Sequence, residues 1–351
     1  MSTELPNLVQ PAADIGAAAE TPSFRESRVR IVMAAGFVAL AVVCLLVRLL
    51  DRPGSMTGQF PEWFSQAVVS RLQKISGEWS LASMLIYPFA LLAILLLERV
   101  MPAVPSQRTL SNGLVHDALW VIVEAVVIVV FLGGYGRILY GLYDRYLSFL
   151  TLPLAGALPP LVLLVIGAII LDLMRWCQHW LHHHVRWLWP FHAVHHAQRE
   201  LNLFSDYRIH FMEYLVRRPV AVLPMLMLGL DAPEVTWWLL LLAWHARLYH
   251  ANIKSDFGVL RYVFVTPQSH RVHHSCRPEH FDCNYGAMLS VWDYLFGTQY
   301  RRYDVYPETG IDDDTFPAES AHSVSGVVGN VVRQMVYPFK RLWRMRADTN
   351  G

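Results

Sequence analysis

The chain has 351 residues, of which 54% are hydrophobic and 16% are charged, whereas about 25% charged is usual for soluble proteins. With 29 Lys and Arg against 28 Asp and Glu, the formal net charge is +1, which excludes the strongly positive field of a nucleic-acid binder. The 4 cysteines form no C-x-x-C pair and indicate neither a disulfide framework nor a cysteine-ligated zinc site. We therefore expect a membrane protein with no nucleic-acid partner.

The apolar residues gather in long runs. Residues 1–30 form a polar tail without a small-residue cleavage site, which predicts an uncleaved N-terminus. Four runs then approach the roughly 20 apolar residues that cross a bilayer: 31–47, 79–97, 118–136 and 146–171. A proline in the first turn of a helix costs no hydrogen bond. The fourth run is therefore expected to become helical at Pro160 and to continue toward His184.

Two shorter apolar runs, 219–230 and 235–246, predict a re-entrant hairpin or two tilted short helices. The flanking segments 185–218 and 247–281 are rich in arginine, which is typical of the cytoplasmic side. We expect these segments to lie there, on the inner membrane if the protein is bacterial.

The expected fold is an all-α integral membrane protein with four to six membrane-embedded helical elements. A cytoplasmic histidine-rich helical cap is predicted over residues 178–218 and 247–310. Glu124 interrupts the third run, where an ionisable residue is either functional or packed against other helices. Residues 326–346 mix apolar and basic positions and suit either an amphipathic segment on an anionic leaflet or a frayed tail.

The most informative residues are the 16 histidines. Positions i, i+3 and i+4 share one face of a helix, so an H-x-x-H-H run aims three imidazoles toward one point. One such run can arise by chance on a surface, but this chain has three of them. Neutral imidazole is the commonest metal ligand, and the clusters offer more nitrogens than one ion accepts, which implies two metals. The clusters are His179-Trp-Leu-His182-His183-His184, His192-Ala-Val-His195-His196 and His270-Arg-Val-His273-His274.

The residues alone leave the metal open, because imidazole suits zinc, copper, iron and nickel. The sequence lacks H-E-x-x-H and H-x-x-E-H, which disfavours a zinc peptidase. Its one E-x-x-H pair, Glu319 and His322, lies in the polar C-terminal part, so a carboxylate-bridged centre of a four-helix bundle is not expected. A haem protein or a histidine-rich metal carrier remains an alternative, although a carrier would place ligands near the bilayer midplane.

Several motifs together resemble the fatty acid hydroxylase superfamily, which includes the sterol desaturases. The resemblance covers about residues 160–300. The motifs are His179-x3-His183, Arg186-Trp-Leu-Trp-Pro-Phe-His192-Ala-Val-His195-His196, Thr266-Pro-Gln-Ser-His270-Arg-Val-His273-His274-Ser, Asn284-Tyr-Gly and Trp292-Asp-Tyr-Leu-Phe-Gly297-Thr298. This resemblance implies a histidine-bound, non-haem di-iron enzyme that uses O2 and external electrons to oxidise an unactivated C–H bond of a lipid.

The resemblance also implies a set of site residues. The expected metal ligands are His179, His183, His192, His195, His196, His210, His250, His270, His273 and His274. The assignment of His210 rests on a histidine that many relatives follow with proline, where this chain has Phe211. Asp172 and Asn252 are expected to assist catalysis, Asp172 by orienting a liganding imidazole or alternatively by pairing with an arginine. His116, His280 and His322 are expected to be ordinary surface residues, and His245 to bond a carbonyl.

Helix geometry adds one distinction within His182-His183-His184. At about 100° per residue, His183 lies about 40° from His179 and His182 about 60° on the other side, while His184 points about 140° away. Geometry therefore excludes His184 and does not separate the other two. The family's H-x3-H spacing selects His183.

The function expected from the resemblance is hydroxylation of a fatty acyl chain, a sterol or a related lipid, with desaturation as the alternative within the family. Zinc is expected to be able to replace the two irons in purified protein. No fused cytochrome b5 or ferredoxin segment is visible, so we expect a separate electron donor of one of these types. The expected domains are a polar tail at 1–30, N-terminal spans at 31–150, a fatty acid hydroxylase-like catalytic domain at 151–310 and an amphipathic C-terminal tail at 311–351.

Overall fold

The computed structural model describes residues 81–349, except 109, 128–132, 153, 155–156, 231, 318 and 320–322. The chain divides into two units, residues 1–40 and 41–351, and all described residues belong to the second. The predicted polar tail and the first predicted span, 31–47, therefore lie outside the described residues.

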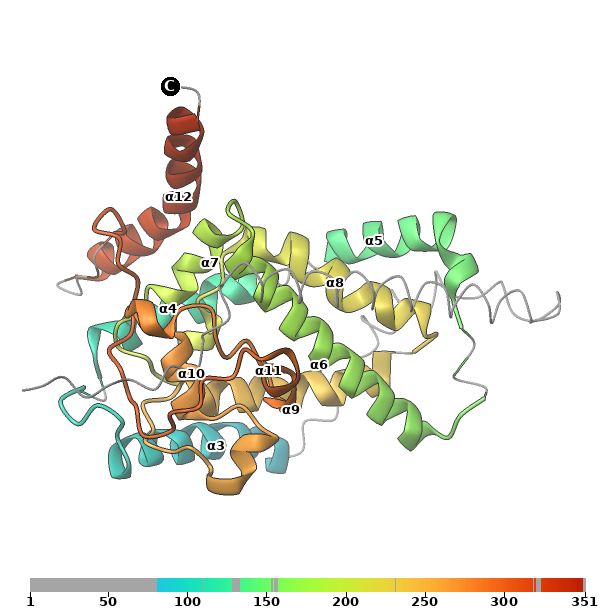
Figure 1. Ribbon diagram of the computed structural model, residues 1–351, viewed down its shortest axis with the longest axis horizontal. Helices are drawn as coiled ribbons and strands as arrows, with labels where there is room; N and C mark the ends of the chain where they lie inside the picture. The colour runs from blue at the N-terminus through green and yellow to red at the C-terminus, as the bar shows by residue number, and fades with distance from the viewer. Residues whose placement is uncertain are drawn as a thin grey trace, which may run out of the picture. The chain divides into compact units, whose positions relative to one another are not determined.

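The regular structure of the described residues is helical, with three isolated β-bridges and no strand among them. This agrees with the all-α expectation (Figure 1). The longer helices are α3 (Leu81–Val100), α4 (Asn112–Val127), α5 (Gly133–Tyr146), α6 (Pro160–His184), α7 (Trp189–His196), α8 (Tyr214–Met227), α9 (Ala232–His250), α10 (Pro267–His273), α11 (Val291–Phe296) and α12 (Val324–Thr349). Short 3₁₀ helices are η2 (Ser148–Leu150), η4 (Ser205–Tyr207), η5 (Phe211–Glu213), η6 (Gly258–Tyr262) and η7 (Pro278–His280).

Helix α6 occupies the middle of this arrangement and packs against α7, α8 and α9 (Figure 1). It starts at Pro160 and ends at His184, which confirms the boundaries expected from the proline and the histidines. Leu163, Leu171 and Trp176 of α6 are buried. The long apolar helix thus carries the first histidines directly into the interior.

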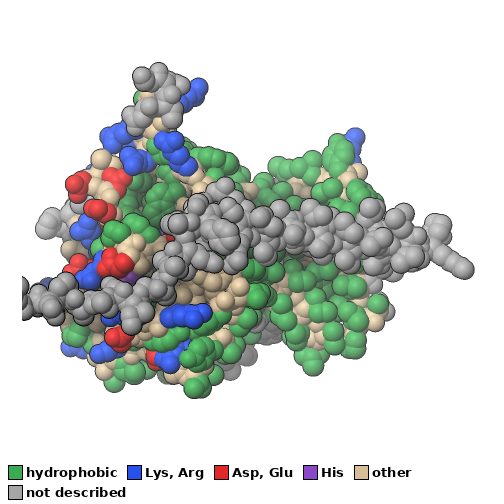
Figure 2. Space-filling model, viewed as in Figure 1, with side chains coloured by type: hydrophobic (Ala, Val, Ile, Leu, Met, Phe, Trp, Pro, Cys, Tyr) green, Lys and Arg blue, Asp and Glu red, His purple; other side chains and the backbone are tan. Residues whose placement is uncertain are grey.

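Among the described residues, one helix is long and apolar enough to cross a bilayer, and its span is Leu161–His184 in α6. Large exposed apolar side chains lie on α6, on α3 and on α5, where solvent would disfavour them; they include Leu161, Val165, Ile169, Leu92, Leu96, Ile138 and Leu142. Figure 2 shows hydrophobic side chains gathered over the region of α5, α6 and α8, whereas charged side chains gather nearer to α12. This surface is compatible with a membrane protein.

The other predicted spans match the helices less simply. The second, 79–97, corresponds mostly to α3. The third, 118–136, is divided between α4 and α5, with residues 128–132 outside the description. The number of spans and the cytoplasmic side of the histidines stay predictions.

The predicted hairpin corresponds to helices α8 and α9, which are joined by a turn at Gly229. This glycine has φ +61°, and a Cβ built there would lie 2.5 Å from the carbonyl oxygen of Leu152. Both the left-handed backbone and the close approach require glycine. The turn therefore fixes where α8 ends and sends α9 back toward the histidine clusters.

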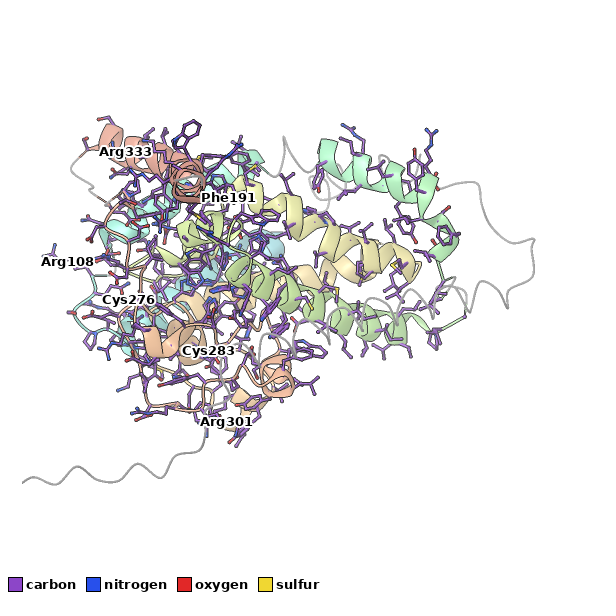
Figure 3. The ribbon with its side chains drawn as sticks, turned by 45° about the horizontal axis from the view of Figure 1, so that its top comes forward. Arg108, Phe191, Cys276, Cys283, Arg301 and Arg333 are labelled. Carbon is purple, nitrogen blue, oxygen red and sulfur yellow. The ribbon has the colours of Figure 1, made fainter. Side chains whose placement is uncertain are left out.

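The amphipathic C-terminal segment forms helix α12, which packs against α4 and α7. Trp120 donates a hydrogen bond to Gln334 at 3.2 Å, and Val331 and Tyr337 share a buried core with Val194. The Phe191 ring of α7 lies 5.5 Å from the ring of Phe339, between the two helices in Figure 3. Helix α12 therefore supports the helix that carries the second histidine box.

A buried ionic network ties the segment after α7 to α4. The guanidinium of Arg208 lies 2.7 Å from Asp117 and also pairs with Glu319. Asp117 accepts further hydrogen bonds from Gln198, Asn202 and Ser205. Because a buried charge is tolerated only when it is paired and hydrogen-bonded, this network holds residues 198–208 in one conformation.

Candidate metal centre

The first histidine box lies at the end of α6. His179 and His183 are one turn apart, so both rings leave the same face of the helix and approach to 5.3 Å between centroids. The helix ends at His184, which places both rings at the boundary between the apolar helix and the polar segments that follow.

Two short helices carry the other two boxes. Pro190 lies in the first turn of α7, and Pro267 opens α10 after Thr266, whose side chain forms a capping box with Ser269. Prolines in the first turn and reciprocal caps define where a helix starts, and so they fix the directions of the imidazoles that follow. His250 is the last residue of α9 and enters between the two short helices.

The structure sorts nine histidines into two groups. In each group, one nitrogen from every ring lies within 4.8 Å of those of the others. We name them the first and second histidine groups. The first contains His179, His183, His192, His196 and His273, and the second contains His195, His250, His270 and His274. Helix α7 contributes to both groups, because His195 faces the second while its neighbours face the first.

Backbone carbonyls fix the tautomer of three of these rings. The Nδ1 atoms of His179 and His273 lie 3.0 Å and 2.7 Å from the carbonyl oxygens of Tyr285 and Cys283. The Nδ1 atom of His250 lies 2.8 Å from the carbonyl oxygen of Ala246. A carbonyl oxygen only accepts, so each Nδ1 carries the hydrogen and donates it. The lone pair of each neutral ring is then on Nε2, which points into its group.

These inward lone pairs face one another at short distance. The Nε2 atoms of His179 and His273 are 2.9 Å apart, and that of His250 is 2.8 Å from Nε2 of His270. Burial lowers the pKa of His273 to about 4, and it also lowers the pKa values of His192, His195, His196, His270 and His274. These imidazoles are therefore uncharged near neutral pH. Converging neutral imidazoles of this kind fit metal ions.

The sequence did not single out Glu213 as a partner of the histidines. The carboxylate Oε2 lies 3.1 Å from Nδ1 of His192, and the side chain is 2% exposed. Burial raises the pKa of Glu213 to about 7, and the nearby Arg217 opposes this shift. A carboxylate behind a liganding imidazole orients the ring and raises its basicity. The only signal in the sequence is the position of Glu213, three residues after His210.

The segment that supplies the carbonyls for His179 and His273 has an unusual backbone. Asp282 and Asn284 have φ values of 56° and 57°, a region that non-glycine residues rarely adopt. Asp293 accepts hydrogen bonds from the backbone N–H groups of Tyr285 and Gly286, both at 2.8 Å. The conformation of residues 282–286 is therefore held from outside, and it directs two of the histidines.

The structure does not bring His210 to either histidine group. Its Nε2 lies 2.9 Å from the carbonyl oxygen of Met335, and its Nδ1 accepts a hydrogen bond from the N–H of Met212. Both ring nitrogens are thus occupied by the backbone. His210 connects η5 to α12 in this arrangement, which leaves no nitrogen for a metal.

Asp172 and Asn252 also lie apart from the histidine nitrogens. Asp172 accepts hydrogen bonds from the N–H groups of Met288 and Leu289, at 3.0 and 3.1 Å, and from the Trp292 indole at 2.9 Å. The side chain of Asn252 binds the backbone of Val104 in both directions. Within the described residues, neither bonds an imidazole, and both hold segments against the helices.

The remaining histidines have other partners. His184 stacks on Trp180 and its Nδ1 lies 3.0 Å from that residue's carbonyl oxygen. His182 is fully buried, and its Nδ1 lies 2.7 Å from the carbonyl oxygen of Gln178. Neither joins a histidine group, as the rotation about α6 predicts for His184. His245 lies 2.8 Å from the carbonyl oxygen of Val265, in agreement with expectation. His116 and His280 are buried, contrary to the surface positions expected, and His322 lies outside the description.

Together, the helical fold and the two histidine groups define a protein with a buried, histidine-lined site that could hold metal ions. Residues 164–298 match the family model described as fatty acid hydroxylase. This part of the chain is therefore similar to the fatty acid hydroxylase family, and the resemblance expected from the motifs is confirmed.

Several curated proteins are similar to this chain. An ornithine lipid hydroxylase of Rhizobium tropici is 30% identical over 184 residues, which are 51% of this chain and 51% of the relative. An alkylglycerol monooxygenase of Danio rerio is 32% identical over 127 residues, covering 34% of this chain and 27% of the relative. A protein of Arabidopsis thaliana named CER1-like 1 is 22% identical over 59% of this chain and 35% of its own length. The chain thus spans about half the length of the first relative and less of the others. No solved structure matches the chain.

Proposed function

We propose that this protein is a membrane-bound oxygenase that hydroxylates an unactivated C–H bond of a lipid. The observation that carries the proposal is the pair of histidine groups, whose neutral, inward-facing nitrogens suit two metal ions. The relatives support the reaction class, because two of them are named as a lipid hydroxylase and a monooxygenase. In the overall reaction, a C–H bond and O2, with two electrons and two protons, give a C–OH bond and one water.

Iron is the metal we propose for both groups. Imidazole accepts iron, zinc and copper alike, so the donors alone do not decide. A hydroxylation needs a metal that changes oxidation state, and zinc has no redox chemistry. When bound, the two irons would supply the activation of O2 and the transfer of electrons to it. Zinc in purified protein would then be a substitute and would not contradict the proposal.

The chain's own residues would hold these ions and exclude water. The carbonyls of Tyr285 and Cys283 keep His179 and His273 in the tautomer that presents Nε2. Glu213 holds His192 from behind. Tyr285 is fully buried, and its ring centroid lies 5.2 Å from that of His183. These contacts pre-organise the ligands before any ion binds, which is how a protein fixes metal geometry.

We further propose that the histidines face the cytoplasm and that electrons come from a separate protein of the ferredoxin or cytochrome b5 type. The basic segments 185–218 and 247–281 support the orientation. The exposed apolar surface of α3, α5 and α6 supports a multi-pass membrane protein whose substrate reaches the site from the bilayer.

The decisive experiment uses purified full-length protein with total membrane lipids, a ferredoxin reducing system and isotopically heavy O2. We expect two irons per chain and a lipid product that gains one heavy oxygen atom, as measured by mass spectrometry. His273→Ala should lose the product and iron while remaining folded in detergent. Loss of two hydrogens from the lipid would instead indicate desaturation. Metal flux in proteoliposomes without lipid oxidation would reject the oxygenase in favour of a carrier.

A further inference from the structure

A second set of ionisable groups, most of them with a buried polar atom, lies beside the first histidine group. We name it the interior charge cluster. It consists of Glu124 on α4, Arg175 on α6, Asp206 on η4, Glu213 on η5, Arg217 on α8 and Arg247 on α9. The four long helices bring these residues together although they are up to 123 positions apart in the chain. In a sequence with 16% charged residues, such a concentration inside the protein requires an explanation.

The charges of this cluster interact without forming ion pairs. Glu124 lies within electrostatic range of Arg217, Arg175 and Arg247, and Asp206 lies within range of Arg247. Among the described residues, no ion pair joins an arginine of the cluster to one of its carboxylates. The neighbouring Arg208 behaves differently, since it pairs directly with Asp117 at 2.7 Å.

Buried polar atoms of the cluster also lack hydrogen-bond partners within the described part of the chain. They are Glu124 Oε2, Asp206 Oδ1, Glu213 Oε1, Arg217 Nε and Arg247 Nε, with His182 Nε2 beside them. Glu213, Arg247 and His182 are each more than nine-tenths buried. Buried polar atoms are nearly always satisfied by protein, water or a ligand. These arginines and carboxyl groups have no ion partner among the described residues, and their unsatisfied atoms indicate a place for a polar guest.

The cluster adjoins both the metal centre and the apolar surface. Glu213 lies 3.1 Å from His192 and 3.9 Å from His182. On the other side, Tyr214 donates a hydrogen bond of 2.5 Å to Glu124. Glu124 on α4 and Arg217 on α8 are themselves partly exposed, so the cluster reaches the surface of these helices. A guest that fills the cluster can therefore keep a hydrocarbon chain in the bilayer.

We propose that the interior charge cluster binds the headgroup of an amphiphile that carries both an ammonium and a carboxylate. Three guanidiniums and three carboxylates match a guest with one charge of each sign better than an anion or a neutral glyceride. The arginines would bind the carboxylate, and Glu124 with Asp206 would bind the ammonium. One consequence of this inference rests on the proposed function. Because Glu213 belongs to the cluster and also contacts the first histidine group, the carbon that is oxidised lies in the headgroup or next to it.

The test compares four lipids with the same acyl chains: ornithine lipid, which has both charges, its N-acetylated form, its methyl ester and a neutral diacylglycerol. Binding is measured on the purified, metal-loaded full chain in uncharged detergent, without an electron donor, so that no turnover occurs. We expect the wild type to bind ornithine lipid at least about tenfold more tightly than either capped form, the scale of a lost hydrogen bond to a charged group. Equal binding of all four lipids would overturn the proposal.

Two variants test which residue of the cluster recognises each charge of the headgroup. Arg217→Gln should lose the discrimination against the methyl ester, and Glu124→Gln the discrimination against the N-acetylated lipid. Arg301→Gln, at an exposed site seen in Figure 3, is the matched control and should change neither. Unchanged discrimination in folded variants of Arg217 and Glu124 would refute their roles. If a variant loses iron or aggregates, the comparison of lipids on the wild type decides alone.

Turnover separates this inference from the proposed function. Discrimination between lipids without oxidation of any lipid would reject the hydroxylase and keep the headgroup site. Equal oxidation of ornithine lipid and diacylglycerol would keep the hydroxylase and reject the headgroup site. With both intact, fragmentation of the product should place the new hydroxyl in the headgroup or on the first acyl carbons, and a hydroxyl near the methyl end would contradict the geometry.

Discussion

Removing the carboxylate behind His192 tests how much the partners of the ligands matter. In Glu213→Gln, the amide oxygen can still accept the hydrogen of His192 Nδ1, but the negative charge that Glu213 carries above its pKa of about 7 is gone. In Glu213→Ala, the buried Nδ1–H loses its partner altogether. A buried hydrogen bond to a charged group contributes about 1.5–3 kcal/mol, which corresponds to about 10–100-fold in affinity. We expect Gln to weaken iron binding about tenfold and Ala about 100-fold, in the range usual for such partners.

The assay is chelator competition on purified full-length protein, with iron per chain measured by elemental analysis at each chelator concentration. Glu279→Gln, at an exposed position of η7, is the control and should behave as the wild type. Circular dichroism and size-exclusion profiles establish that the variants are folded. If folded Glu213→Ala retains iron at the same chelator concentration as the wild type, the assignment of Glu213 as an orienting partner is wrong.

His183→Ala should abolish lipid oxidation, His184→Ala should retain most of it and His182→Ala should fall between, since only His183 of the three reaches a histidine group. An inactive His184→Ala would contradict the orientation of these side chains on α6. His210→Ala should keep its iron but become sensitive to proteolysis near α12, because both ring nitrogens bind backbone groups; loss of iron would restore it as a ligand. Arg301→Cys in a membrane otherwise free of reactive thiols should react only with reagent applied from the cytoplasmic side, and labelling from the opposite side would invert the orientation.

The start and end of α6 and the separation of His183 from His184 could be predicted from the sequence, because they depend on local rules. A proline in the first turn positions the helix start, and 3.6 residues per turn positions each imidazole. The histidine boxes likewise predicted converging imidazoles, and the structure gathers them in two groups. These inferences need no knowledge of how distant segments pack.

The division of the histidines between the two groups could not be predicted in this way. His192, His195 and His196 belong to one box, yet His195 joins His250 and His270 while its neighbours join α6. That sorting depends on how α7 is rotated between α6 and α10, which its packing against α12 helps to set. Asp172 and Glu213 show the same limit, because each acquires its partners from far along the chain and no spacing rule identifies them.

Peptide carbonyls orient His179 and His273, and this affects which substitutions the site tolerates. Since the oxygens come from the backbone of Cys283 and Tyr285, other side chains at these two positions can present the same acceptor. The constraint falls instead on conformation, at Asp282 and Asn284, where β-branched residues or proline would be strained. Directed evolution at Cys283 should therefore tolerate side-chain changes more readily than changes of backbone preference at its neighbours Asp282 and Asn284. A substitution there should alter metal binding while leaving every histidine of the two groups in place.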